Sequence, residues 1–151
     1  MKTIIRLIPG ALLCAFIASG CTHTEKKTVN IEAYDSLKFS VKEITASPGQ
    51  EIDLTLKVIS NLPKANMSHN WVLLKKSTDV SQFISDGIQQ KENQYVAPKD
   101  EQYVIATTGL VGGGETKTIT FKAPEEKGEY TFVCTFPGHY QAGMKGKFIV
   151  E

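Results

Sequence analysis

Apolar and polar residues alternate with a period of two along most of this 151-residue chain. The clearest run covers residues 52–58, where Ile52, Leu54, Leu56 and Val58 are separated by polar side chains. Such a run predicts a β-strand that has one face in a core and the other in water. Other runs of this kind lie at residues 37–41, 69–73, 103–106, 116–121, 130–134 and 147–150. A chain patterned in this way is constrained to fold as sheets that face one another.

We therefore predict an all-β fold, an antiparallel Greek-key β-sandwich of seven to eight strands. One segment departs from the alternation. Residues 79–90 place apolar side chains at positions 80, 83, 84 and 88, with Thr78 or Asp79 as N-cap. This spacing predicts a short amphipathic helix. We expect one helical insertion between Leu74 and Tyr103, with no internal repeat and no second domain.

The first twenty residues have the layout of a signal peptide. Lys2 and Arg6 precede an apolar run at residues 7–17, which is shorter than the roughly 20 apolar residues of a membrane span. Three small residues at 18–20 then lead to Cys21, as in a bacterial lipobox. We predict a lipoprotein-type signal peptide, with lipidation of Cys21 after cleavage. A plain signal peptide cut near residue 20 is the alternative.

We divide the chain into a signal peptide at 1–20, a polar tether at 21–34 and a single domain at 35–151. The protein is then exported, to a bacterial periplasm or cell surface, and anchored to a membrane through lipid on Cys21. Net charge is +1, from 17 basic and 16 acidic residues, and loss of the two basic residues in 1–20 makes it −1. This balance excludes nucleic-acid binding driven by charge. It also predicts partner encounters that depend little on salt.

Three cysteines have three different expected fates. Cys14 leaves with the signal peptide and Cys21 carries lipid, so Cys134 is the only free thiol and has no disulfide partner. A lone thiol in an oxidising compartment is exposed to oxidation. It is protected either as an inert core residue or as a metal ligand.

The surroundings of Cys134 favour a metal. Eleven residues rich in turn formers contain Cys134, His139 and Met144, and His69 lies far upstream at the start of a predicted strand. One thiolate, two imidazoles and a weak axial thioether compose a blue-copper electron-transfer site. Zinc also binds Cys and His, but Met144 favours copper because a thioether is a poor zinc ligand. A Cys–His hydrolytic pair is the other alternative. No orienting acid supports it, so we expect no enzymatic activity.

The motifs around these residues resemble a known family. HNWVL at 69–73, CTFPGH at 134–139 and MKG at 144–146 are similar to segments of the azurins and auracyanins, which are cupredoxins. The resemblance extends from about residue 37 to residue 150. Four residues lie between the last histidine and the methionine, a spacing closer to the auracyanins than to azurin proper.

The resemblance implies a cupredoxin-like copper-binding domain with one type 1 copper. Its ligands would be His69, Cys134 and His139, with Met144 in the axial position. The backbone carbonyl of Ser68 would be a distant second axial group, at a position where azurins have glycine.

Two further residues are implied as supports of the ligands. The Asn70 side chain would hydrogen-bond toward the cysteine loop, and the Phe136 N–H would point at the Cys134 sulfur. Hydrogen bonds of this kind orient metal ligands and tune the metal.

The family role is single-electron transfer between redox partners, in respiration or photosynthesis. His139 would be the electron exit, at the centre of a docking patch formed by Met67, Pro137, Gly138, Ala142 and Gly143. Expected partners are redox proteins such as cytochromes or membrane oxidoreductases, with the carrier itself a monomer. The alternative is a periplasmic copper-binding carrier or sensor without an electron-transfer role.

Overall fold

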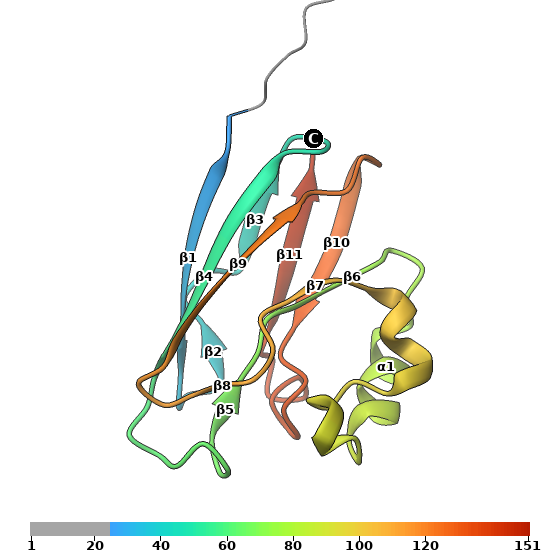
Figure 1. Cartoon of the computed structure of the whole chain (residues 1–151). Coiled ribbons are helices and arrows are strands. Elements are labelled where there is room, and N and C mark those ends of the chain that lie inside the picture. Colours follow the sequence, from blue (N-terminus) through green and yellow to red (C-terminus); the bar gives the residue numbers. More distant parts are fainter. Residues whose placement is uncertain (1–24) are drawn as a thin grey trace, which may run out of the picture.

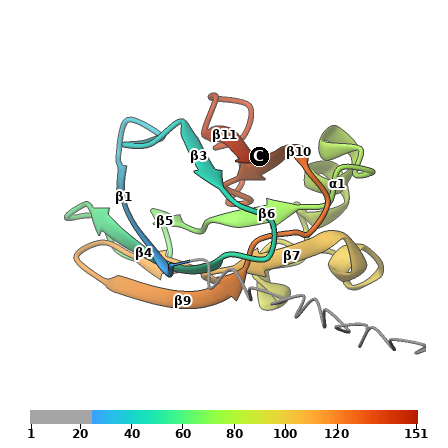
Figure 2. The same cartoon turned by 90° about the horizontal axis from the view of Figure 1, so that it is seen from above.

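Two β-sheets face one another, with a helical segment at one side (Figures 1 and 2). The computed structural model describes residues 25–151. The predicted signal peptide and the predicted lipidation site Cys21 lie outside the described residues. Within residues 25–151, no helix is both long and apolar enough to cross a membrane.

The sheets differ in size. The first has the strand order β2–β1–β4–β9, with bounds β2 Lys38–Phe39, β1 Lys27–Tyr34, β4 Glu51–Ile59 and β9 Thr116–Lys122. The second has the order β3–β11–β10–β6–β7, with bounds β3 Glu43–Ala46, β11 Lys145–Val150, β10 Gly128–Val133, β6 Val72–Leu74 and β7 Val104–Thr107. A small ribbon pairs β5 (Ser68–His69) with β8 (Val111–Gly112).

The predicted β-sandwich is confirmed, but its strands are not all antiparallel. β1 runs parallel to β4, and β3 runs parallel to β11. Period-two alternation carries no information on strand direction. A parallel pair also needs a crossover, and here the chain between β1 and β4 passes through β3 in the other sheet. Eight of the eleven strands in residues 25–151 have at least three residues, and the other three have two.

The predicted polar tether is wrong for residues 27–34, which form β1 in the interior of the first sheet. Val29, Ile31 and Ala33 point into the core with 8%, 1% and 0% of their surface exposed. Alternation therefore begins at Val29. Because charged and polar residues flank these three positions, a local reading takes the segment for a tether. The folded domain begins well before residue 35.

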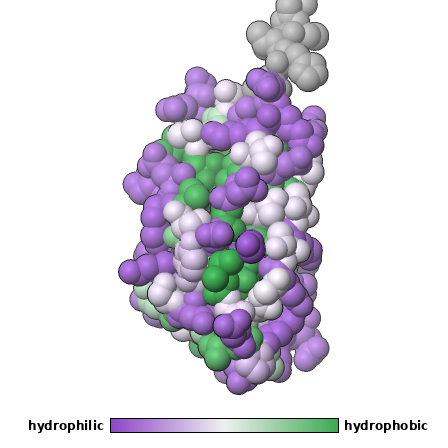
Figure 3. Space-filling view, turned by 90° about the vertical axis from the view of Figure 1, so that its left-hand side faces the viewer, coloured by the Kyte–Doolittle hydropathy of each residue, from purple (hydrophilic) through white to green (hydrophobic). Residues whose placement is uncertain are grey.

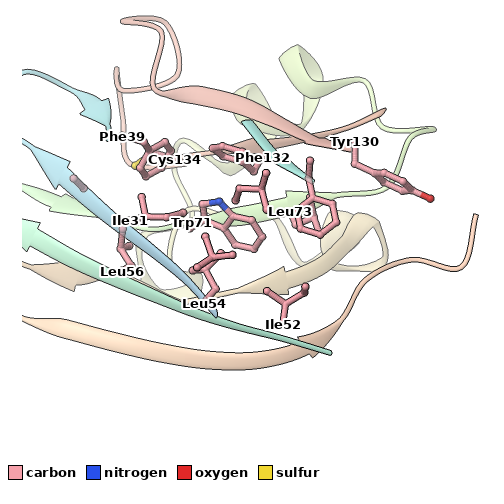
Figure 4. Close-up of a cluster of buried hydrophobic side chains, with 14 of the residues drawn as sticks. Ile31, Phe39, Ile52, Leu54, Leu56, Trp71, Leu73, Tyr130, Phe132 and Cys134 are labelled. Carbon is pink, nitrogen blue, oxygen red and sulfur yellow. The ribbon is translucent and has the colours of Figure 1, made fainter. Parts of the chain in front are cut away.

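A fully buried tryptophan organises the core between the sheets. The Trp71 ring lies 5.6 Å from that of Phe121 in β9 and 5.5 Å from that of Phe132 in β10, so it bridges both layers. Figure 4 shows its indole between Leu54 and Phe132, with Cys134 at one end of the cluster. The backbone of Trp71 exchanges two 3.0 Å hydrogen bonds with Thr108. Because Trp71 lies two positions after His69, the core fixes the chain beside that histidine.

The helical insertion follows β6. Helix α1 covers Val80–Gly87, and Asp79 caps it by accepting a hydrogen bond from the Gln82 N–H, as predicted. Two short 3-10 helices follow, at Lys91–Asn93 and Pro98–Tyr103. Ile88, expected on the apolar face, is 42% exposed because the helix has ended. A Cβ on Gly87 would collide with the Tyr95 carbonyl, so glycine allows residues 94–96 to pack closely here.

Candidate metal centre

Three side chains from separate parts of the fold meet at one end of the sandwich. His69 lies at the end of β5, Cys134 directly follows β10, and His139 lies in the loop between β10 and β11. The two Nδ1 atoms are 3.1 Å apart, and the Cys134 Sγ is 4.0 Å from the Nδ1 of His69 and 3.4 Å from that of His139. Their exposed fractions are 0%, 0% and 4%.

This donor set fits a single metal ion. Its three donor atoms lie within 4.8 Å of one another, and no acidic residue belongs to the cluster within residues 25–151. Ligands at about 2.0 Å (nitrogen) and about 2.3 Å (sulfur) in a trigonal plane would stand about 3.5 to 3.8 Å apart. The observed separations bracket that range. Thiolate with two imidazoles is the equatorial set of a blue-copper centre.

The loop that supplies two of these donors is closed by its own backbone. Cys134 N–H donates to the Met144 carbonyl at 3.1 Å, and Met144 N–H donates to the His139 carbonyl at 3.0 Å. His139 N–H donates to the Phe136 carbonyl at 3.1 Å. Met144 is fully buried and belongs to the same apolar cluster as Cys134. The loop turns at Gly143, whose φ of 90° favours a residue without a side chain.

A buried polar network ties this loop to the segment after α1. Asn70 Oδ1 accepts from the Thr135 N–H at 2.8 Å, and Asn70 Nδ2 donates to Thr135 Oγ1 at 2.7 Å. Thr135 Oγ1 in turn donates to the Gln94 carbonyl at 3.0 Å. Gln94 and Tyr95 both adopt left-handed backbone angles, with φ of 56° and 62°. This turn aims the Gln94 carbonyl at the residue next to the thiol.

Burial determines the charge state of the metal-free site. It lowers the pKa of His69 to about 4, and together with the proximity of His69 it lowers the pKa of His139 to about 4 as well. Burial raises the pKa of the Cys134 thiol to about 12, although backbone N–H groups of Asn70 and Phe136 hydrogen-bond to it and oppose that rise. At neutral pH the metal-free site is therefore uncharged, with a protonated thiol and two neutral imidazoles.

Four residues of the predicted docking patch lie within four positions of His139 in the sequence, and Met67 lies two positions before His69. The five residues differ in exposure. Gly138 and Ala142 are exposed, and Met67, Pro137 and Gly143 are half-buried. His139 stacks on Phe136 with ring centroids 4.8 Å apart, and Phe136 meets the edge of Tyr95 at 5.3 Å. Ser68 is buried, and its hydroxyl donates to the Lys64 carbonyl.

Comparison with known proteins agrees with this geometry. The family of copper-binding proteins described as the plastocyanin/azurin family matches residues 25–151. This chain belongs to the plastocyanin/azurin family. The family and the buried donor set together support one type 1 copper as the cofactor. The predicted likeness to azurins and auracyanins is confirmed.

Individual members of the plastocyanin/azurin family are similar over most of the chain. Azurin of Alcaligenes faecalis is 43% identical over 122 residues, which are 78% of this chain and 93% of that protein. Outer membrane protein H.8 of Neisseria meningitidis is 41% identical over 119 residues, and the chain spans only 63% of its length. The structure of auracyanin A, a "blue" copper protein of Chloroflexus aurantiacus, superposes with a TM-score of 0.73 at 33% identity, covering 82% of this chain and 98% of that chain. These relatives imply a blue copper electron carrier.

Sequence reasoning missed three residues behind the loop, namely Thr135, Gln94 and Tyr95. Thr135 lies inside the CTFPGH motif, and its position next to Cys134 could have identified it from the sequence. Gln94 acts through its backbone carbonyl, a group that every residue has. No side-chain pattern identifies such a role.

Proposed function

We propose that this protein is a membrane-tethered single-electron carrier whose copper alternates between Cu(II) and Cu(I). His69, Cys134 and His139 would be the equatorial ligands, and Met144 would be axial, with the Ser68 carbonyl as a distant second axial group. Bound copper would take up one electron from a donor protein as Cu(II) and pass it to an acceptor protein as Cu(I). The protein holds the ligands, excludes water and offers a contact surface, and no substrate is converted.

Rigidity of the ligand loop is the main contribution of the protein. Thiolate and thioether stabilise Cu(I), whereas imidazole suits both oxidation states. A site that keeps one geometry for both states needs little rearrangement when an electron arrives. The five backbone hydrogen bonds within 134–144 and the Asn70–Thr135 pair hold the donors in this way.

The single observation that carries the proposal is the position of His139. Its Nδ1 faces the other donors, while the residue as a whole keeps 4% of its surface exposed and is flanked by the exposed Gly138. One ring therefore joins a buried centre to the surface of the molecule. A small apolar contact there suits a weak redox encounter that dissociates quickly.

The test is the absorption and paramagnetic-resonance spectrum of the Cu(II)-loaded protein. We expect an intense blue band with the narrow copper hyperfine splitting of a type 1 centre. Cys134→Ser removes the thiolate and is expected to abolish the blue band. Cys21→Ser is the matched control, since it removes a cysteine outside the site and is expected to leave the spectrum unchanged. A colourless, redox-silent copper complex of the unchanged protein would refute the proposal.

A copper carrier or sensor with the same ligands would behave differently. It would release copper rapidly to a weak chelator and exchange electrons slowly. The burial of all three donors argues for slow release. We therefore expect retention of copper against the chelator together with fast electron self-exchange.

We further propose export and anchoring through lipid on Cys21, with the carrier monomeric and its docking patch meeting cytochromes or membrane oxidoreductases. The lipobox at residues 18–21 supports the anchor. The name of the Neisseria relative, an outer membrane protein, is compatible with it. Mass spectrometry of the mature protein tests the anchor directly, because diacylation of Cys21 adds a large, defined mass and the Cys21→Ser variant lacks it.

A further inference from the structure

We infer that the anchor holds the domain with its metal end directed away from the membrane. The electron partner would then reach His139 from the aqueous side, as a soluble carrier or as an extrinsic domain of a larger complex. A redox group confined to the bilayer would not reach it. This inference rests on the proposed lipidation of Cys21, and the argument from the structure begins at Glu25.

The chain is fastened to the domain at its first described residues. Gln50 Nε2 donates to the Glu25 carbonyl at 2.7 Å. Lys26 Nζ lies 3.1 Å from Glu51 Oε1 and 2.8 Å from Asp53 Oδ2. Residues 25 and 26 are thus attached at the start of β4, and β1 pairs with β4 from Lys27 onward. Any pull from an anchor at Cys21 acts on this point of the molecule.

This attachment point and the metal centre lie at opposite ends of the sandwich. β4 begins at Glu51 beside the attachment, and the turn before it is bonded to residues 123 and 124, just ahead of β10. β10 then runs the length of the sheet and delivers Cys134 at its far end. Figure 1 shows the start of β1 near the upper end of the molecule and β5 near the lower end.

The length of the chain between the anchor and the domain decides whether the domain can invert on the membrane. The nine residues of β4 span about 30 Å at about 3.3 Å per residue. Glu25 lies four positions after Cys21, so a fully extended chain between them covers at most about 14 Å. If the docking patch lay on the membrane, the attachment point would stand above the membrane surface by roughly the length of β4. The available chain reaches only about half that height.

Within residues 25–151, few large hydrophobic side chains are exposed on which the domain could lie on the membrane. The large hydrophobic residues that are exposed within residues 25–151 are Ile59, Leu62 and Ile88. Ile59 ends β4 and Leu62 follows it, so both lie toward the metal end. Figure 3 shows mainly hydrophilic residues at the upper end of the molecule on the face beside β1, with smaller hydrophobic patches below them. The attached end is therefore suited to water and headgroups, without insertion.

The test uses the mature lipidated protein on nanodiscs whose lipids carry a gadolinium chelate on the headgroup. Backbone amide signals are recorded for the reduced protein, so the readout needs no electron transfer. We expect loss of the signals of Gln50 and of Ala123, whose N–H donates to the Gln50 carbonyl, and retention of the Gly138 and Ala142 signals. Loss of the last two would overturn the inference. If the signals at both ends are retained, the anchoring is overturned and the orientation with it. That outcome leaves the copper chemistry untouched.

A longer connection provides the matched variant. Twenty Gly/Ser residues inserted before Glu25 give a flexible chain with a typical span of about 27 Å. We expect this variant to lose part of the Gly138 signal. It should also accept electrons faster than the unchanged protein from a quinol confined to the membrane, while both react equally with a soluble cytochrome. Equal rates with the membrane-confined donor would count against the inference.

Discussion

Replacement of Asn70 by alanine provides a quantitative test of the network behind the thiol. Asn70 is fully buried, and its side chain makes hydrogen bonds of 2.8 and 2.7 Å with Thr135 and a longer one of 3.4 Å to the Gln94 carbonyl. Truncation removes the two bonds to Thr135 at about 1 kcal/mol each and leaves the buried Thr135 N–H without a partner at about 1–3 kcal/mol more. We expect a loss of about 3–5 kcal/mol in the free energy of unfolding. Typical domains have about 5–15 kcal/mol, so the variant should still fold.

The assay is urea unfolding of the metal-free protein, followed by the fluorescence of Trp71, the only tryptophan in the chain. Thr135→Val is the matched control. It keeps the N–H bond to Asn70 and loses only the hydroxyl, so we expect a cost of about 1–2 kcal/mol. The double variant should cost less than the sum of the two, because both single changes break one shared bond. An Asn70→Ala cost below about 1 kcal/mol, or strict additivity, would refute the reasoning.

Three further predictions concern other parts of the molecule. Burial raises the pKa of Asp100 above its ordinary 3.8, so its contribution to stability is present at low pH and is lost as pH rises through the folded-state pKa. Asp100→Asn should therefore raise the melting temperature at pH 7, and the gain should vanish below about pH 4. Gly87→Ala should destabilise by about 1–3 kcal/mol in thermal unfolding, because the new Cβ meets the Tyr95 carbonyl. Because the pKa of Cys134 is about 12 and those of the two site histidines are about 4, binding of Cu(II) near pH 7 should release about one proton. Calorimetry in buffers of different ionisation enthalpy measures that number, and a value near two or zero would contradict the assigned charge states.

The sequence predicts best where the structure follows local rules. β4 is half-buried along its whole length, so the alternation of Ile52, Leu54 and Leu56 with polar residues identifies it directly. α1 has both its cap and its apolar positions within a few residues. β1 defeats the same rule because its core residues are fewer and smaller, and charges precede them. Strand direction leaves no trace in the alternation, since a parallel and an antiparallel neighbour bury the same face.

The candidate site divides in a similar way. Cys134, His139 and Met144 lie within eleven residues, so their joint chemistry is visible in one segment. His69 is 65 residues earlier than Cys134, and only its motif connects it with them. Gln94 contributes a carbonyl that is aimed by a left-handed turn. Because that turn occurs here without glycine, neither the turn nor its role is visible in the sequence.

The pairing of β3 with β11 has a consequence for how the protein becomes loaded with copper. Glu43 lies beside Lys147, about a hundred positions later, and β11 also fixes the end of the ligand loop. Contacts this distant in sequence form late and slowly. The two imidazoles and the thiol therefore converge only after an early and a late part of the chain have joined. On the proposed function, we therefore expect metallation to follow folding, with copper entering a finished domain through the surface around His139.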